Sequence, residues 1–379
     1  MKRTLVSIAT ALLGAFYRLC RLGGVRKRIV CLSRQSNDVP LDFQLLAECV
    51  KREHPGYEVV ILARAVEGMP AYCLHMLTQV RYIATSEAVV LDSFCIPVGL
   101  LRGLIHAPVI QMWHSMGNLK HFGYTALGER EGRSAQEARL FHMHEGYDSV
   151  LISSLSFADD FAASMGVRKS LLYEAPLPKA DVLADPQAVA RERARVHAAL
   201  PQTAQRENIV YCPTFRRAPA SNEAEAMQAL LASIDFSAYN LIFMKHPVST
   251  QRIDDARVLQ DYPAGLNMLC VADYVISDYS TVIFEAGLLD VPVYLYAYDW
   301  EEYASRRSLA IDVVREVPAL FTADAARIAR AIRAGEFDHG AYARFVARNI
   351  ALPSGETCTQ RVVRHVFDMI EGKAQRSET

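Results

Sequence analysis

Four short polar clusters of this sequence lie where apolar, strand-like runs end, and they contain the side chains most suited to chemistry. They occupy residues 111–123, 211–217, 245–247 and 278–281. Histidine, lysine, arginine, aspartate and hydroxyl side chains recur in them. An imidazole with a pKa of roughly 6.5 can accept a proton from a hydroxyl at neutral pH, while cations and hydroxyl donors can hold a phosphate group. Together the clusters predict a site for an anionic, phosphate-bearing substrate.

The first cluster contains His114 and Lys120, which follow the apolar run 108–113. We expect His114 to be the base that accepts the proton of an acceptor hydroxyl. Lys120 is expected on the acceptor side, where it would offset phosphate charge. A lone histidine is more often a packed core residue, and that alternative stays open for His114. Its place at a strand end before a polar loop favours a functional role.

The second and third clusters offer cations at the ends of two further predicted strands. Arg216 or Arg217 could pair bidentately with a phosphate. The alternative is that both are solvated loop charges. Lys245 and His246 place a cation beside a titratable imidazole, although a surface turn closed by a proline would give the same residues.

The fourth cluster lies within residues 272–297, which read as a strand, a polar turn, a helix and another strand. Asp278, Ser280 and Thr281 fall at the point where the helix begins. Unpaired backbone N–H groups and the positive end of the helix dipole suit such a turn to phosphate, and the hydroxyls add donors. The alternative is that these side chains only cap the helix.

Apolar strand-like runs alternate with helical patterns along the chain, which is typical of a parallel α/β fold. Strands are expected near 28–33, 57–63, 81–84, 88–91, 108–113, 149–152, 170–173, 208–212, 240–245, 274–277 and 291–296. A polar helical stretch, 185–206, looks like the junction between two Rossmann-like halves. Sheets of this kind bind ligands outside the carboxyl ends of their strands, where the four clusters lie.

Composition excludes several classes of protein. With 379 residues, 51% of them hydrophobic, and a net charge of −1, the chain is globular, has room for two domains and lacks the basic excess of nucleic-acid-binding proteins. Its eight cysteines are scattered without a C-x-x-C pair. That argues against a zinc site or a disulfide framework and favours a reducing cytoplasm. The glycine motifs of dinucleotide dehydrogenases and P-loop enzymes are missing from the sequence.

The N-terminus contains an uncharged run, 4–17, flanked by basic residues. The run is short for a transmembrane helix, which needs about 20 apolar residues, and basic residues stand where a signal peptide would have its cleavage site. Wound as a helix, one face carries Leu5, Ile8, Ala9, Leu12, Leu13, Phe16, Leu19 and Cys20. This pattern predicts an amphipathic helix lying in a membrane interface. A helix packed on its own domain is the alternative.

The motifs W-H-x-x-x-x-L-K-x-x-G, P-T-F-R, K-H-P and S-D-Y-S-T-V-I-F-E occur in this order along the chain. In this combination the sequence, over roughly residues 29–353, resembles the CDP-glycerol glycerophosphotransferases of teichoic-acid and related polymer synthesis. The resemblance implies a GT-B fold, with two Rossmann-like domains facing across a cleft, and a metal-independent reaction without a cofactor. Departures from the family pattern, such as Ser115, lie mainly on the acceptor side or the hinge and leave the acceptor open.

The resemblance also implies roles for individual residues. By position, His114 and His246 match the two essential histidines of the family. Arg216, Ser280 and Thr281 match its donor phosphate ligands. The remaining residues expected to bind the donor are Lys245, Asp278 and Glu285, of which Glu285 matches an acid in the nucleotide site.

The expected domains are a membrane-associating helix over 1–24, an acceptor domain over 25–184 and a CDP-donor domain over 185–372. The predicted function is transfer of glycerol phosphate from CDP-glycerol, or of ribitol phosphate from CDP-ribitol, to a lipid-linked saccharide or polyol-phosphate acceptor. CMP would leave, and the protein would act at the cytoplasmic face of the cell membrane. One alternative is a GT-B glycosyltransferase that uses a nucleotide sugar. Another is a non-catalytic nucleotide- or sugar-binding module, against which the paired histidines argue.

Overall fold

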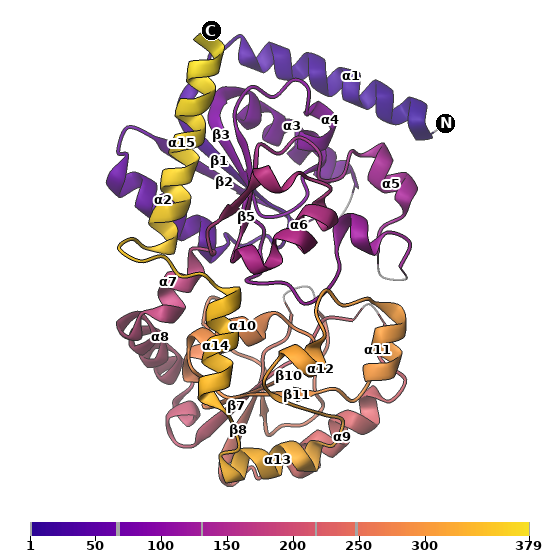
Figure 1. Cartoon of the computed structure of the whole chain (residues 1–379), viewed down its shortest axis with the longest axis vertical. Helices are drawn as coiled ribbons and strands as arrows, with labels where there is room; N and C mark the ends of the chain where they lie inside the picture. Colours follow the sequence, from indigo (N-terminus) through magenta and orange to yellow (C-terminus); the bar gives the residue numbers. More distant parts are fainter. Residues whose placement is uncertain (1, 66–68, 130–131, 217, 247–248, 379) are drawn as a thin grey trace. The chain divides into compact units, whose positions relative to one another are not determined.

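In a computed structural model, which describes residues 2–65, 69–129, 132–216, 218–246 and 249–378, the chain forms two compact units (Figure 1). The first unit contains Met1–Ser115, Phe122–Lys179 and Ala351–Thr379. The second contains Met116–His121 and Ala180–Ile350. Each unit is built around its own parallel sheet.

The sheet of the first unit has six strands in the order β2-β1-β3-β4-β5-β6, all parallel. The strands are β1 (Arg26–Ser33), β2 (Glu58–Ala63), β3 (Ser86–Leu91), β4 (Val109–Gln111), β5 (Ser149–Ile152) and β6 (Leu172–Glu174). Val30 of β1 pairs with Val60 on one side and Val89 on the other. Central strands of such a sheet are covered on both faces, so they read as nearly continuous apolar runs.

The helices of the first unit are α1 (Lys2–Arg21), α2 (Leu41–Glu53), α3 (Met69–Thr85), α4 (Ile96–Leu101), α5 (Ala135–Leu140), α6 (Ala158–Met165) and α15 (Cys358–Glu378). Figure 1 shows α1 beside α3 and α4, which it contacts. The C-terminal helix α15 packs against α2, at the opposite end of the sequence. The last segment of the chain therefore completes the first unit.

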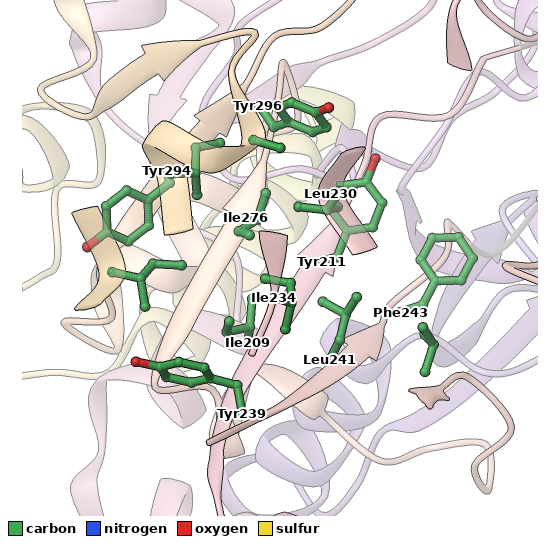
Figure 2. Packing of buried hydrophobic residues seen from close by; sticks show 14 of the residues in the cluster. Ile209, Tyr211, Leu230, Ile234, Tyr239, Leu241, Phe243, Ile276, Tyr294 and Tyr296 are labelled. Carbon is green, nitrogen blue, oxygen red and sulfur yellow. The ribbon is translucent and has the colours of Figure 1, made fainter. Parts of the chain in front are cut away.

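The sheet of the second unit has the order β12-β11-β10-β7-β8-β9, also parallel throughout. Its strands are β7 (Glu207–Cys212), β8 (Tyr239–Phe243), β9 (Val258–Leu259), β10 (Tyr274–Ser277), β11 (Val293–Tyr296) and β12 (Leu320–Thr322). Counted from β9, this is the 3-2-1-4-5-6 order of doubly wound nucleotide-binding sheets. One buried cluster joins Ile209, Leu241, Ile276 and Tyr294 of the sheet to Leu230 (Figure 2).

The helices of the second unit are α7 (Lys179–Ala184), α8 (Pro186–Ala199), α9 (Glu223–Ser233), α10 (Val282–Leu288), α11 (Trp300–Arg306), α12 (Val313–Glu316), α13 (Ala325–Ala334) and α14 (His339–Asn349). Local signals in the sequence explain their limits. Asp324 caps α13 by accepting a hydrogen bond from the backbone of Ala326, and Gly335 ends the helix with a φ of 62°.

The α/β class with parallel sheets is confirmed, but details differ from the expectations. Residues 81–84, expected as a strand, are the end of α3, because Val80, Ile83 and Ala84 are buried at helical spacing. The expected domains assumed a continuous chain in each half. In the structure, residues 116–121 belong to the second unit, and the chain from 351 onward belongs to the first.

Candidate functional site

Each sheet presents its polar clusters at the point where the strand order reverses or one strand away from it. In the first sheet this point lies between β1 and β3. Ser33 ends β1, Asp92 follows β3, and His114 follows β4. Ligands of open α/β sheets bind outside the carboxyl ends of strands at such a point. The first unit therefore brings His114 to the edge where a ligand is expected.

The imidazole of His114 is held in one tautomer by its neighbours. Its Nδ1 lies 2.8 Å from the backbone carbonyl oxygen of Asp92, and the side-chain amide of Gln35 lies 3.2 Å from the same nitrogen. A carbonyl oxygen only accepts, so Nδ1 carries the proton and Gln35 must direct its amide oxygen toward it. The lone pair of the neutral ring is then on Nε2. This is the tautomer that a base needs.

The backbone before His114 is strained. Trp113 has a φ of 66°, a conformation that costs a bulky residue about 1–3 kcal/mol. Its N–H donates to Oε1 of Gln111 at 3.1 Å, and its ring stacks on Phe122 with centroids 4.6 Å apart. Strain that neighbouring groups hold in place is often found at functional sites.

Asp92 is a buried carboxyl beside this histidine. It is 3% exposed, and among the described residues its Oδ1 has no hydrogen-bond partner. Burial raises the pKa of Asp92 to about 6, although nearby serine hydroxyls oppose the change. Our reading of the sequence missed Asp92, Gln35 and Gln111. The position of Asp92 in the sequence could have indicated it, because it directly follows a buried strand, and His114 lies similarly close to the end of its strand.

In the second unit, Arg216 lies in a buried ion-pair network rather than in solvent. Its Nε and Nη2 donate to the two carboxylate oxygens of Asp299 at 2.6 and 2.9 Å, and Nη2 also donates to Asp278 at 2.9 Å. Its Nη1 donates to the carbonyl of Thr214. The arginine side chain is 7% exposed and both carboxylates are 2% exposed. A bidentate phosphate contact from Arg216 would require some of these bonds to break.

Asp278 connects the two central strands of this sheet. Its Oδ1 accepts from the backbone N–H of Thr214, after β7, at 2.9 Å and from that of Tyr279, after β10, at 2.6 Å. The two loops that flank the reversal point of the second sheet are thus joined. The following turn carries Ser280, whose Oγ accepts a long, 3.4 Å bond from Val282. Thr281 is the N-cap residue of α10 and makes no capping bond with its side chain.

Lys120, expected on the acceptor side, belongs to the second unit. Its Nζ donates to Oγ1 of Thr214 at 3.1 Å and lies 5.5 Å from the centre of the Tyr303 ring. Gly117 makes this route possible, because its φ is 64° and an added Cβ would lie 2.4 Å from Phe284. The loop that begins at the first motif therefore delivers its lysine to the end of β7.

His246 lies close enough to Lys120 for the two to interact electrostatically. The pKa of His246 is lowered, first because the surrounding protein removes water from the ring and then because of the charge of Lys120. This holds although the His246 side chain is exposed. Its ring centroid lies 5.5 Å from that of Phe215. Because a lowered pKa favours the neutral ring, His246 can offer a phosphate an N–H donor, while Lys120 supplies charge.

The other expected donor-site residues lie on the same unit. Lys245 is exposed two residues after β8, and Glu285 is half-buried on α10. Arg217 of the second cluster and Pro247 of the third lie outside the described residues. A cavity of about 390 Å³ adjoins Thr214 and Arg216. Its other walls include Phe215, Glu223, Gln251 and Tyr298.

Comparison with known proteins agrees with these features. The family described as CDP-glycerol:poly(glycerophosphate) glycerophosphotransferase matches residues 16–368. The teichoic acid ribitol-phosphate primase of Bacillus spizizenii is 25% identical over 356 residues, which cover 90% of each protein. The teichoic acid glycerol-phosphate primase of Bacillus subtilis is 25% identical over 276 residues, 68% of this chain and 69% of the relative.

A solved structure of a variant of the wall teichoic acid polymerase TagF, soaked with CDPG, has the same fold. It matches with a TM-score of 0.74 at 15% identity and covers 98% of both chains. At this identity the likeness supports a GT-B-like architecture and nothing finer. The family match, in contrast, spans most of the sequence and includes all four polar clusters. The chain therefore belongs to the CDP-glycerol:poly(glycerophosphate) glycerophosphotransferase family.

Proposed function

We propose that this protein transfers a polyol phosphate from CDP-glycerol or CDP-ribitol to a hydroxyl of a lipid-linked acceptor and releases CMP. The observation that carries the proposal is the set of cationic, imidazole and hydroxyl groups gathered at the carboxyl edge of the second sheet. Lys120, Thr214 and His246 lie around the ends of β7 and β8 there. Ser280 and Thr281 follow β10, the strand next to β7. The family of the chain supplies the donor class.

The reaction needs one base and a charge-stabilising site. The acceptor oxygen attacks the β-phosphorus of the donor, and its proton passes to Nε2 of His114. The bond from that phosphorus to the oxygen of CMP breaks, and CMP leaves with the electron pair. Lys120 and the neutral His246 would stabilise the developing charge on the phosphate oxygens. No covalent enzyme intermediate is required, because positioning and electrostatics suffice.

Donor binding is assigned to the second unit. Ser280, Thr281 and Lys245 would contact the diphosphate, and Glu285 the nucleoside. Arg216 and Asp278 would act by fixing the two loops between which the diphosphate lies, since their polar atoms already bond to each other and to the backbone.

The adjoining cavity of about 390 Å³ is our candidate site for the polyol. Glu223 accepts hydrogen bonds there from the side chain of Gln251 and from the backbone of Ala220. A carboxylate, an amide and hydroxyls beside the aromatic Tyr298 suit the many hydroxyls of a polyol. Glu223→Gln should then weaken binding of CDP-ribitol or CDP-glycerol and leave CMP affinity unchanged. Loss of CMP affinity would mean that the cavity holds the nucleoside.

Peripheral membrane association at the cytoplasmic face is part of the proposal. Leu13 and Tyr17 of α1 are buried, and the Tyr17 hydroxyl accepts a bond from the backbone of His106. Four other apolar residues of α1 are 53–67% exposed, namely Leu5, Ile8, Leu12 and Leu19. By length and composition alone, Arg3–Arg21 is also long and apolar enough to cross a membrane. We favour a helix lying in the interface, because one face is already packed on the protein.

The test is direct incubation of the purified chain with CDP-glycerol, CDP-ribitol or nucleotide sugars, each with lipid-linked acceptors. Mass spectrometry of the lipid products and assay of the released nucleotide distinguish the alternatives. CMP released with a product heavier by one polyol phosphate supports the proposal. A nucleoside diphosphate released from a nucleotide sugar supports a glycosyltransferase. Binding without turnover of any donor would indicate a non-catalytic module.

A further inference from the structure

We propose that Gln111 is the positioning residue for His114, acting through the backbone of Trp113 and held in turn by Tyr147 and His144. This inference rests on the proposed function, because it takes His114 to be the base. It adds residues that hold the base in position, and all of these residues lie in the first unit.

Gln111 is the last residue of β4 and is completely buried. Its Oε1 accepts from the N–H of Trp113 at 3.1 Å. Its Nε2 donates to the carbonyl of Ser93 at 3.3 Å and to the hydroxyl of Tyr147 at 3.1 Å. Because a backbone N–H only donates and a carbonyl only accepts, these contacts fix the orientation of the amide. All of its bonds would be lost in an apolar residue of the same size.

The hydrogen bonds continue in one direction away from Gln111. The Tyr147 hydroxyl accepts from Gln111, so its own proton is free to go to Nδ1 of His144, 3.1 Å away. His144 is 5% exposed, and burial lowers its pKa to about 3, so the ring is neutral and Nδ1 accepts. Burial raises the pKa of Tyr147, which keeps its proton in place. The chain of bonds is therefore complete and stable at neutral pH.

Trp113 is where this chain acts on the site. Its φ of 66° turns the backbone immediately before His114. If Gln111 no longer accepted the Trp113 N–H, that donor would lose its buried partner and the backbone would gain from relaxing toward an extended conformation. The imidazole of His114 would then move away from the Asp92 carbonyl, 2.8 Å from its Nδ1, that fixes its tautomer. Stacking of Trp113 on Phe122 would restrain the ring but not the backbone N–H.

The experiment compares Gln111→Met with Gln79→Met in the full chain. Gln79 is also completely buried in the first unit, but both polar atoms of its amide are without partners among the described residues. Gln111→Met should lower kcat by about 10²-fold, the loss that a misplacement of about 1 Å can cause, and leave KM for the CDP-polyol unchanged. It should also change the ¹⁵N NMR signature of the His114 tautomer. Gln79→Met should change neither.

A second variant, Gln111→Glu, tests the direction of the bonds. A protonated carboxyl can accept from Trp113 and donate as the amide did, whereas a carboxylate cannot donate to Ser93 or Tyr147. Relative to the parent at the same pH, the variant should therefore keep its kcat while the new carboxyl is protonated and lose kcat as pH rises, with an inflection that the parent lacks. Other titratable or charged groups lie around position 111, namely Tyr147, His144, Cys95, Tyr124 and Arg34. The pH profile of the parent is the control for their contribution.

The outcomes separate cleanly. A Gln111→Met protein with reduced thermal stability, but with the parent kcat per folded molecule and the parent His114 tautomer, would overturn the proposal. If Gln111→Met does not fold, Tyr147→Phe removes the next bond and should lower kcat less but in the same direction, again without a change in KM. If the parent turns over no CDP-polyol, the proposed function fails, while the NMR comparison still decides whether Gln111 orients His114.

Discussion

At the scale of single residues, the proposed reaction assigns proton transfer and charge stabilisation to different side chains. His114 donates from Nδ1 to a backbone carbonyl, which leaves Nε2 as its basic atom. His246 has a lowered pKa, to which the charge of Lys120 contributes, and in the proposed reaction it would serve as a neutral donor. A phosphate-transfer site needs a base and a charge-stabilising donor, and under the proposal these residues would supply them without competing for the same proton.

The two histidines should therefore respond differently to removal. His114→Ala should lower turnover by about 10²–10⁴-fold and leave affinity for CDP-glycerol nearly unchanged, whereas His246→Ala should weaken donor binding as well. His339→Ala, at an exposed histidine on α14, is the control. Single-turnover rates, calorimetric affinities and melting temperatures measure each effect. If His114→Ala turns over at the parent rate, His114 is not the base.

Lys120 should act on the donor rather than on the acceptor. Lys120→Met should weaken binding of CMP and of CDP-glycerol, by about 1.5–3 kcal/mol for each charged hydrogen bond lost. The pKa of His246 should rise in the variant, because the charge of Lys120 helps to lower it. Calorimetry and NMR titration test both effects, with the exposed Lys51→Met as the control. Unchanged nucleotide affinity together with a raised KM for the acceptor would return Lys120 to the acceptor side.

Asp92 predicts a pH dependence of stability. Its pKa is raised to about 6 in the folded protein, from an ordinary value of about 3.9. The folded state then binds more protons than the unfolded state between these values, so this group lowers the unfolding free energy as pH rises through that window. The total effect is up to about 3 kcal/mol, at about 1.4 kcal/mol per pH unit.

Asp92→Asn should remove this contribution, so that the variant gains stability relative to the parent as pH increases from about 4 to about 6. Urea unfolding across that range measures the difference. Asp159→Asn, at an exposed aspartate of the same unit, should leave the parent profile in place. A constant difference in stability between parent and Asp92→Asn would contradict the raised pKa.

At the scale of elements, sequence patterns predicted the strands well and the site supports poorly. Buried runs such as 88–91 and 274–277 form strands of a covered sheet, as expected. The end of α3 was misassigned because a short apolar run fits both periods. Gln111 was missed because a single polar residue inside an apolar run gives no sign of its partners, which lie 18 and 36 residues away.

Substitutions at the N-terminus of α10 distinguish helix capping from ligand binding. Thr281 makes no capping bond with its side chain, so Thr281→Ala should leave stability unchanged and weaken CMP binding. Ser280 makes a long capping bond, so Ser280→Ala should also cost stability, near the lower end of the usual range of about 0.5–2 kcal/mol. Thermal unfolding and CMP calorimetry on both variants decide the matter. A destabilised Thr281→Ala with parent CMP affinity would show that the threonine only caps.

At the scale of the whole molecule, the division into two units does not follow the order of the sequence. Residues 116–121 leave the first motif and join the second unit, while residues from 351 onward return to the first. Sequence order alone did not predict that these segments belong to the other unit. Their places depend on residues far away in the sequence, such as Phe284, which lies against Gly117. The strand-end rule still located both polar edges, since it depends on sheet topology rather than on domain limits.

The proposed membrane association belongs to this scale, because α1 would have to serve the fold and a lipid surface together. Deleting the helix would remove the buried Leu13 and Tyr17 and confuse unfolding with release. Replacing the exposed Leu5, Ile8 and Leu12 by glutamine should instead reduce flotation with anionic vesicles and leave the melting temperature unchanged. Each buried leucine-sized side chain contributes about 1.5–3 kcal/mol, and each nearby basic residue about 1 kcal/mol.

High salt should therefore weaken the binding of the parent but not abolish it, since the apolar contribution is not screened. Leu155→Gln, at an exposed leucine outside α1, is the matched control and should float like the parent. A triple glutamine variant that floats as well as the parent would place the membrane contact elsewhere. If the variant stays soluble and keeps its turnover with a water-soluble acceptor, but loses turnover with a lipid-linked one, the helix serves to bring the enzyme to an acceptor held in the membrane.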